Sequence, residues 1–274
     1  MEDLQTKKLK SGEISEQTYD FNSKWYAEKE CKSFNDASLP PTEDGFFCPK
    51  CKNKRYIGIV EYVDGIYYQS TIPCECQERL KAEKNIKASG LKAVKELDTF
   101  KAAEKWQEVI KHKAERFLQQ TENRCYYVGG QTGAGKTHIC SGIAWELAKK
   151  GKSLLYFSWA DEASQLTTYS NESRFSRLEE LARVDLLYID DFLKPHGDGY
   201  NRAEIGLAFD IIDRRYRDES KSTIISSELT IQKLVNVDQA TAGRIVEMAG
   251  EFIANINADP KKNYRLKGFN MVTI

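Results

Sequence analysis

Hydrophobic residues follow one pattern after about residue 121 and another before it. In residues 121–274, short apolar runs alternate with longer stretches of helical periodicity. This alternation is typical of a parallel sheet covered by helices on both faces, so we expect an α/β domain over residues 121–274. The expected strands are 125–128, 153–157, 184–189 and 222–226, with helices at 136–149 and 202–217 and a last strand within 251–256.

The residues before 121 form three segments. Residues 1–45 are polar with sparse apolar positions, and we expect a helical or flexible segment without a core of its own. Residues 46–76 contain two β-rich runs on either side of Asp64-Gly65, a pair that favours a two-residue hairpin turn. Residues 77–120 are charged and helical in period, with breaks at Ser89-Gly90 and near Asp98, and are expected to form a helical linker.

Composition restricts the classes of function. The hydrophobic fraction is 41%, typical of a globular protein, and 41 basic residues balance 41 acidic ones. A zero net charge excludes bulk electrostatic attraction to nucleic acid or to a membrane surface, so any nucleic-acid binding must be local. The first residues have no apolar segment typical of a secretory signal, and no apolar run approaches the roughly 20 residues that span a bilayer. We therefore expect a cytoplasmic protein without a membrane partner.

The sequence GQTGAGKT fits the phosphate-binding pattern G-x-x-x-x-G-K-[ST] in full, between an expected strand and an expected helix. Glycines allow backbone N–H groups to surround a phosphate, and the helix N-terminus adds partial positive charge. We expect Lys136 to reach the β- and γ-phosphates and the Thr137 hydroxyl to bind Mg²⁺. A chance glycine-rich turn is the alternative. The candidate nucleotide-binding residues are Gly130, Gln131, Thr132, Gly133, Ala134, Gly135, Lys136, Thr137 and the adjacent His138, for which packing or polar lining is favoured over catalysis.

Two carboxylates follow an expected buried strand, at Asp190 and Asp191. Ligands of parallel sheets lie at the carboxyl ends of the strands. We assign Asp190 to Mg²⁺, through water, and Asp191 to polarising the attacking water; capping of the next turn is the alternative. The expected strand at 153–157 lies in the sequence between the glycine-rich loop and the acidic pair. We therefore expect the strands that carry these two motifs to be apart in the sheet. The strand that precedes Glu228 ends in polar residues, among them Ser227, that can sense the γ-phosphate.

Four of the seven cysteines cluster, and the other three are scattered. Cys48 and Cys51 form one close pair, Cys74 and Cys76 form another, and the hairpin between them can bring the pairs together. This arrangement suits a structural Cys₄ zinc site, which would fold a module too small to be stable alone. Buried free thiols and a redox or iron–sulfur site are the alternatives. Basic and aromatic residues around the module suit either single-stranded nucleic acid or, as favoured here, a protein partner.

The motifs GGQTGAGKTH, LLYIDDF, STIISSE, GRIVEM and NYRLKG together resemble the AAA+ domain of DnaC/DnaI-type replicative helicase loaders of bacteria and phages. The resemblance covers most of the chain but not residues 1–40. It implies an AAA+ fold, weak ATP hydrolysis, assembly into an ATP-dependent ring or spiral, and delivery of a hexameric helicase to single-stranded DNA. By this resemblance Arg244 matches an arginine finger that acts on a neighbouring subunit, and Arg265 matches sensor 2.

Two features depart from the family pattern. Glu228 stands where many relatives have asparagine at the end of the sensor-1 strand, so Ser227 is the candidate substitute. Fewer than 20 residues follow the expected last strand, from which we expect a truncated lid. Arg244 as an ordinary helix residue and Arg265 as a surface charge are the alternatives to their family roles. A transposition-helper ATPase and a non-hydrolysing, ATP-switched adaptor are the alternative functions.

Overall fold

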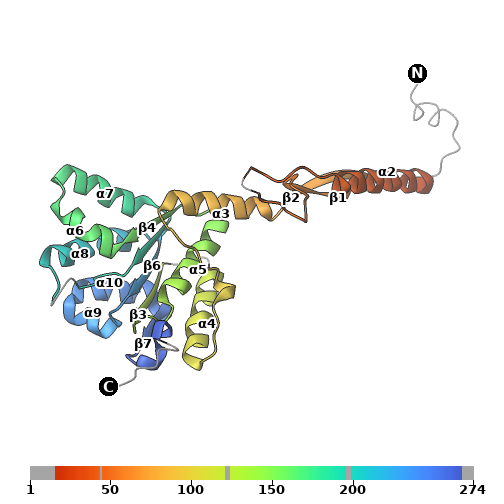
Figure 1. Cartoon of the computed structure of the whole chain (residues 1–274). Helices are drawn as coiled ribbons and strands as arrows, with labels where there is room; N and C mark the ends of the chain where they lie inside the picture. Colours follow the sequence, from red (N-terminus) through yellow and green to blue (C-terminus); the bar gives the residue numbers. More distant parts are fainter. Residues whose placement is uncertain (1–15, 44, 121–123, 196–198, 267–274) are drawn as a thin grey trace. The chain divides into compact units, whose positions relative to one another are not determined.

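The computed structural model describes residues 16–43, 45–120, 124–195 and 199–266. The chain divides between Leu80 and Lys81 into two compact units, which are described separately (Figure 1). Helix α3 (Cys76–Ser89) begins in the first unit and ends in the second. The start of the expected N-terminal segment (1–15), the expected domain boundary at 121 and the last residues (267–274) lie outside the described residues.

The first unit contains helix α2 (Glu16–Asp36) and an antiparallel pair of strands, β1 (Tyr56–Val63) and β2 (Ile66–Pro73). The hairpin expected from the sequence is confirmed. Asp64 and Gly65 both have positive φ, +50° and +83°, as the favoured two-residue turn requires. The amide side chain of Asn35, near the end of α2, accepts from the Gly58 N–H at 2.8 Å and donates to the Gly58 carbonyl at 2.9 Å. Helix α2, the helical part of the expected N-terminal segment, thus packs on the hairpin.

The second unit is built on a five-stranded parallel sheet, and its α/β class is confirmed. The order of the strands is β4-β5-β6-β3-β7. The strand that enters the glycine-rich loop, β3, is separated from the strand that ends in the acidic pair, β5, by β6. The separation agrees with the sequence-based expectation, but the strand at 153–157 does not cause it, because that strand lies at the edge of the sheet beyond β5. The strands are β3 (Cys125–Gly130), β4 (Leu154–Ser158), β5 (Leu186–Asp190), β6 (Ser222–Ser227) and β7 (Ile253–Ile256).

Helices cover both faces of this sheet, because successive strand residues point to opposite sides. Tyr126 and Tyr188 are buried with the residues of α4 and α5, whereas Tyr127 and Leu187 are buried with those of α6 to α10. None of the described helices is long and apolar enough to cross a bilayer. The helices are α4 (Lys105–Gln119), α5 (Lys136–Lys149), α6 (Trp159–Thr168), α7 (Asn171–Arg183), α8 (Arg202–Arg217), α9 (Ile231–Val237) and α10 (Gln239–Ala249), with short 3₁₀ turns at Leu97–Thr99, Gly250–Phe252, Pro260–Lys262 and Tyr264–Leu266.

Residues 81–120, expected to be a linker, belong to the core of the second unit. Ile86, Leu97, Phe100 and Ile110 are each less than 10% exposed and lie in the same apolar cluster as α5 and the sheet. Helix α4 packs in this core because its apolar residues are spaced so that they form one continuous apolar stripe facing the neighbouring helix. The compact unit that contains the glycine-rich loop therefore begins about 40 residues earlier than the pattern of strands suggested.

Arg215 in α8 is a buried cation that joins three elements of the second unit. Only 1% of the residue is exposed, and the guanidinium donates to the carbonyls of Ala182 (2.9 Å) and Val184 (2.6 Å), to the Ser222 carbonyl and to the Thr223 hydroxyl. Burial lowers the pKa of Arg215 to about 10. The neighbouring Arg217, in contrast, forms an ion pair with Asp213 at 2.7 Å.

We expect Arg215→Met to lower the free energy of unfolding by about 3 kcal/mol or more, because several buried carbonyls lose their donor. Arg217→Met is the matched control, since its side chain is 76% exposed and it should cost less than about 1 kcal/mol. Urea-induced unfolding of the two variants measures the difference. Equal losses for the two arginines would contradict a structural role for the buried guanidinium.

Candidate functional site

The glycine-rich loop connects β3 to α5 at the carboxyl edge of the sheet. Gly130 has φ of +113°, and a Cβ atom there would lie 2.0 Å from the Ile256 carbonyl oxygen. Gly133 has φ of +73°, and a Cβ atom would lie 1.9 Å from Oδ1 of Asn263. Both positions therefore require glycine for the conformation of the loop and for the close approach of the chain after β7.

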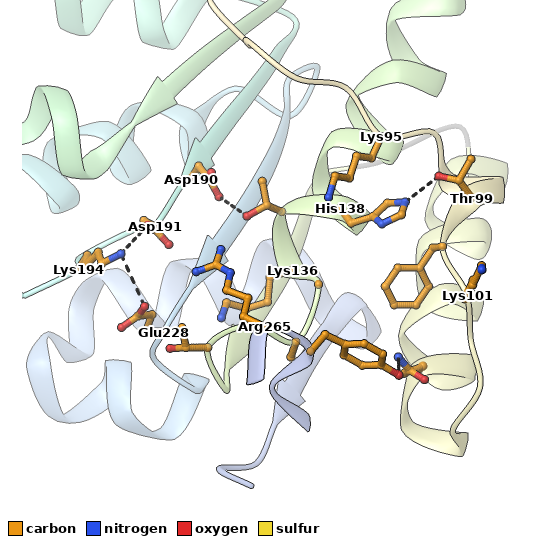
Figure 2. Close-up of a pocket in the computed structure, with 18 residues that line it drawn as sticks. Lys95, Thr99, Lys101, Lys136, His138, Asp190, Asp191, Lys194, Glu228 and Arg265 are labelled. Carbon is orange, nitrogen blue, oxygen red and sulfur yellow. Dashed lines mark hydrogen bonds and ion pairs between the residues drawn. The ribbon is translucent and has the colours of Figure 1, made fainter. Parts of the chain in front are cut away.

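The loop forms one wall of a cavity of about 630 Å³ (Figure 2). Both carboxylates of the acidic pair reach the cavity, as do four lysines. The size and the mixture of a phosphate-binding loop, acids and cations suit a nucleotide with a divalent cation. The lining consists of Lys95, Thr99, Phe100, Lys101, Gln107, Thr132, Gly133, Ala134, Gly135, Lys136, Thr137, His138, Asp190, Asp191, Lys194, Glu228, Tyr264 and Arg265.

Lys136 is held inside the loop that precedes it. Its Nζ donates to the carbonyls of Gly130 and Gln131, both at 2.9 Å, and the residue is 7% exposed. Burial lowers the pKa of the Lys136 ammonium. A buried ammonium with only neutral carbonyl partners is poorly compensated, so an anionic phosphate in the loop would be a favourable additional partner.

Asp190 and Thr137, the expected magnesium pair, lie side by side. The Thr137 hydroxyl is 3.4 Å from Oδ1 of Asp190. The same carboxylate accepts from the hydroxyls of Tyr188 (2.9 Å), Tyr156 (3.2 Å) and Ser226. Burial raises the pKa of Tyr188, so its hydroxyl keeps its proton and donates. These neutral donors orient Asp190 without cancelling its charge, which suits a carboxylate that binds a cation.

Asp191 lies in a left-handed turn directly after β5, with φ of +55°. Its backbone N–H donates to the Ser226 hydroxyl at 3.2 Å, and its carboxylate forms an ion pair with Lys194 at 2.8 Å. Lys194 also lies 3.7 Å from the carboxylate of Glu228 (Figure 2). Lys194 was not predicted as a site residue, because the only feature in the sequence that marks it is its position three residues after the acidic pair.

Ser227 does not reach the cavity, contrary to the sequence-based expectation. It is completely buried, its hydroxyl donates to the Phe192 carbonyl at 2.7 Å and it accepts from the Leu229 N–H at 3.1 Å. The reason is the alternation of side chains along β6, which turns Ser227 inward and leaves Glu228, beyond the end of the strand, facing the cavity.

His138 and Arg265 both line the cavity (Figure 2). The His138 imidazole contacts the Thr99 hydroxyl at 3.0 Å and the Glu96 carbonyl at 3.1 Å, and burial lowers its pKa. These contacts fit a lining role. Arg265 is carried by a strap after β7 that is fixed to the loop, because the Tyr264 N–H donates to the Gly133 carbonyl at 3.0 Å.

Arg244 lies in α10, and it is not among the residues that line this cavity. Its Nε donates to Asp213 at 2.9 Å, and its guanidinium lies 4.6 Å from the centre of the Phe209 ring. On α8, Arg214 pairs with Glu179 of α7. Any action of Arg244 on a nucleotide thus requires the nucleotide of another copy of the chain.

The wall of the cavity formed by residues 95–107 was also missed, because this segment was assigned to a linker. Phe100 lies against the loop, and a Cβ atom on Gly135 would come within 2.9 Å of its ring. Gln107 in α4 donates to the Tyr264 hydroxyl at 2.7 Å. No local motif marks these positions.

The four clustered cysteines lie together in the first unit. All four are buried, and their Sγ atoms lie within 4.8 Å of one another. The distances are 3.8 Å between Cys48 and Cys74 and 3.5 Å between Cys51 and Cys76, close to the about 3.8 Å separation of sulfurs around a tetrahedral zinc ion. Burial disfavours the Cys48 thiolate, but hydrogen bonds from the backbone N–H and thiol of Cys51, the backbone N–H of Lys50 and the thiol of Cys74 outweigh it and lower the pKa of Cys48 to about 7. The donor set fits zinc.

Basic residues near this cluster have partners within the unit. Lys50 pairs with Glu75 at 2.5 Å and Lys52 with Asp36 at 3.7 Å, while Lys54 donates to the Ala37 carbonyl. The Arg55 guanidinium lies over the Phe46 ring. Cations engaged in this way are less available to phosphates, so the electrostatic argument for nucleic-acid binding by this unit is weakened.

Comparisons with known proteins identify a family. The model of the family described as IstB-like ATP binding protein matches residues 72–245. Protein XkdC of the phage-like element PBSX of Bacillus subtilis is 34% identical over 146 residues, 51% of this chain and 53% of its own length. The putative ATP-binding protein of insertion sequence IS232 of Bacillus thuringiensis is 31% identical over 137 residues, covering 48% of this chain and 51% of that protein.

The resemblance to helicase loaders is confirmed by a further match. The replicative helicase loader DnaC of Buchnera aphidicola (from Acyrthosiphon pisum) is 28% identical over 159 residues, 54% of this chain and 63% of DnaC. The matched part of this chain spans about half to two thirds of the length of these relatives.

We expect Lys136→Ala to abolish ATP binding, because the loop loses the ammonium that compensates the phosphate charge. Lys152→Ala is the matched control: burial also lowers the pKa of Lys152, but its Nζ bonds to the Ser222 hydroxyl at the opposite edge of the sheet. Calorimetric titration with ATP and Mg²⁺ measures both affinities. Undiminished ATP affinity in Lys136→Ala would overturn the assignment of the loop.

We expect one zinc ion per chain by elemental analysis, reduced severalfold by Cys51→Ala because a closed site needs all four thiolates. Cys125→Ala is the control, since Cys125 is fully buried outside the cluster and burial raises its pKa to about 12. A first unit that stays folded by circular dichroism without any metal would contradict a structural zinc site.

Proposed function

Since the chain belongs to the family of IstB-like ATP-binding proteins, we propose that it is an ATPase that loads a hexameric replicative DNA helicase onto single-stranded DNA. The observation that carries the proposal is the convergence of Lys136, Thr137, Asp190 and Asp191 on one cavity. The loader role is supported by the match to DnaC, the relative reported above with the largest share of both chains aligned.

The residues at the cavity fit ATP and Mg²⁺. The amides of the loop and Lys136 hold the β- and γ-phosphates, and the hydroxyl of Thr137 with the carboxylate of Asp190 holds the cation. The bound cation supplies charge neutralisation on the phosphate oxygens. Asp191 orients the attacking water and accepts its proton, and Arg265 neutralises developing negative charge.

Turnover in this proposal is weak for an isolated chain and rises on assembly. Arg244 does not line the cavity of its own chain, so it serves as an arginine finger only when copies associate in a ring or spiral. Asp213, which is 9% exposed, fixes the guanidinium through Nε. An oriented arginine of this kind stabilises the charge of phosphoryl transfer in a neighbouring site.

The first unit is the part that binds the helicase in this proposal. Its hairpin exposes Tyr62, Val63 and Tyr68, each at least half exposed, whereas the nearby lysines are engaged internally. Exposed aromatic and branched apolar residues are the usual anchors of protein interfaces. Zinc at the four cysteines supports the fold of this surface.

The match to the IS232 protein favours a second candidate, a transposition-helper ATPase. The two functions differ in partner. A pull-down of a purified hexameric replicative helicase by the immobilised chain, with and without ATP, separates them: the loader binds helicase in a nucleotide-dependent way, and the transposition helper does not.

We expect Asp191→Asn to bind ATP but to lose turnover by roughly 100-fold or more, since the water loses its general base. Single-turnover loading of the helicase should fail with this variant. The exposed Asp161, whose carboxylate accepts from the Ser158 hydroxyl, provides the control Asp161→Asn with unchanged turnover. If Asp191→Asn loads helicase as well as the unaltered chain, hydrolysis is not needed and the protein is an ATP-switched adaptor.

A further inference from the structure

The end of the cavity beside the acidic pair contains an unusual group of charges: Lys194 lies between the carboxylates of Asp191 and Glu228 (Figure 2). The ammonium is 2.8 Å from Asp191 and 3.7 Å from Glu228. All three side chains line the same cavity as the P-loop and Lys136.

Glu228 creates an electrostatic problem for a site that binds a triphosphate. It faces the cavity just beyond β6, where an ionised carboxylate repels a γ-phosphate, and Asp191 adds a second negative charge. Ser227 offers no neutral alternative, because its hydroxyl already has both a donor and an acceptor partner. A cation between the two carboxylates reduces this repulsion.

The backbone fixes Lys194 at this place. Asp191 and Leu193 both have left-handed φ values, +55° and +51°, which fold the chain back so that the Lys194 N–H donates to the Asp191 carbonyl at 3.0 Å. The Phe192 N–H donates to the Ser226 carbonyl at 2.8 Å, and Phe192 is completely buried. The turn is therefore anchored to β6, and the lysine stem starts from a rigid position.

We propose that Lys194, held between Asp191 and Glu228, is a positioning residue for the carboxylate of Asp191 and recognises the γ-phosphate of ATP in place of a neutral sensor residue. An ammonium has three donors; Asp191 takes one, Glu228 attracts the second and the third is available to a phosphate oxygen. This inference rests on the proposed ATPase function.

A lysine that binds the γ-phosphate affects the affinity for ATP but not for ADP, because only ATP places a phosphate charge beside Lys194. We expect Lys194→Ala to weaken ATP binding about tenfold or more, the scale of one charge-assisted hydrogen bond, with ADP affinity changed by less than about twofold. Lys194→Arg should restore the preference for ATP. Lys194→Ala combined with Glu228→Gln should recover much of the ATP affinity, since one repulsive charge is gone, yet turnover should stay low because Asp191 is no longer held.

Lys221→Ala is the matched control. Lys221 pairs with Asp185 at 3.1 Å, directly before the start of β5. The substitution therefore removes a lysine ion pair at the end of β5 opposite to Asp191. Calorimetry with ATP and with ADP, together with single-turnover hydrolysis, measures each variant. Equal losses of ATP and ADP affinity in Lys194→Ala, or behaviour like Lys221→Ala, would overturn the inference. If the proposed ATPase function is wrong, the result differs: the unaltered chain and Lys136→Ala would then bind ATP equally poorly.

Discussion

The parallel alignment of β3, β5 and β6 is the constraint on which the candidate site depends. Each strand contributes chemistry where it ends: the glycine-rich loop after β3, the acidic pair at the end of β5, and Glu228 after β6. Because parallel strands end at the same edge, these groups converge although they are far apart in sequence. Full burial of the strands on both faces makes this arrangement rigid.

Charges at that edge are balanced in two different ways. Asp190 is surrounded by hydroxyl groups, which orient it and leave its charge available to a cation. Asp191 is paired with Lys194, which orients it and offsets part of its charge. The two adjacent carboxylates therefore lie in different environments. This difference allows the two acids to have different roles.

The two units are stabilised by different means. The second unit buries two apolar clusters on either side of a sheet, large enough to include a cation such as Arg215 whose donors are satisfied by carbonyls. In its described residues the first unit has helix α2, a two-stranded hairpin and the start of α3, and its buried apolar cluster consists of the four cysteines with Phe46 and Ile57 beside them. A two-stranded hairpin is only marginally stable alone, which explains why a metal-binding donor set occurs here.

Features that depend on neighbouring residues could be predicted from the order of the amino acids. The loop from Gly130 to Thr137, the Asp64-Gly65 turn, the spacing of the cysteines and the alternation of strands and helices all follow from local geometry, within one turn or one element. Three features emerged only in the folded chain: Ser227 points inward, Phe100 and Gln107 form a wall of the cavity, and Lys194 meets Glu228. The reason is physical: these contacts join residues distant in sequence, and their geometry is set by the order of the strands and the path of a buried turn.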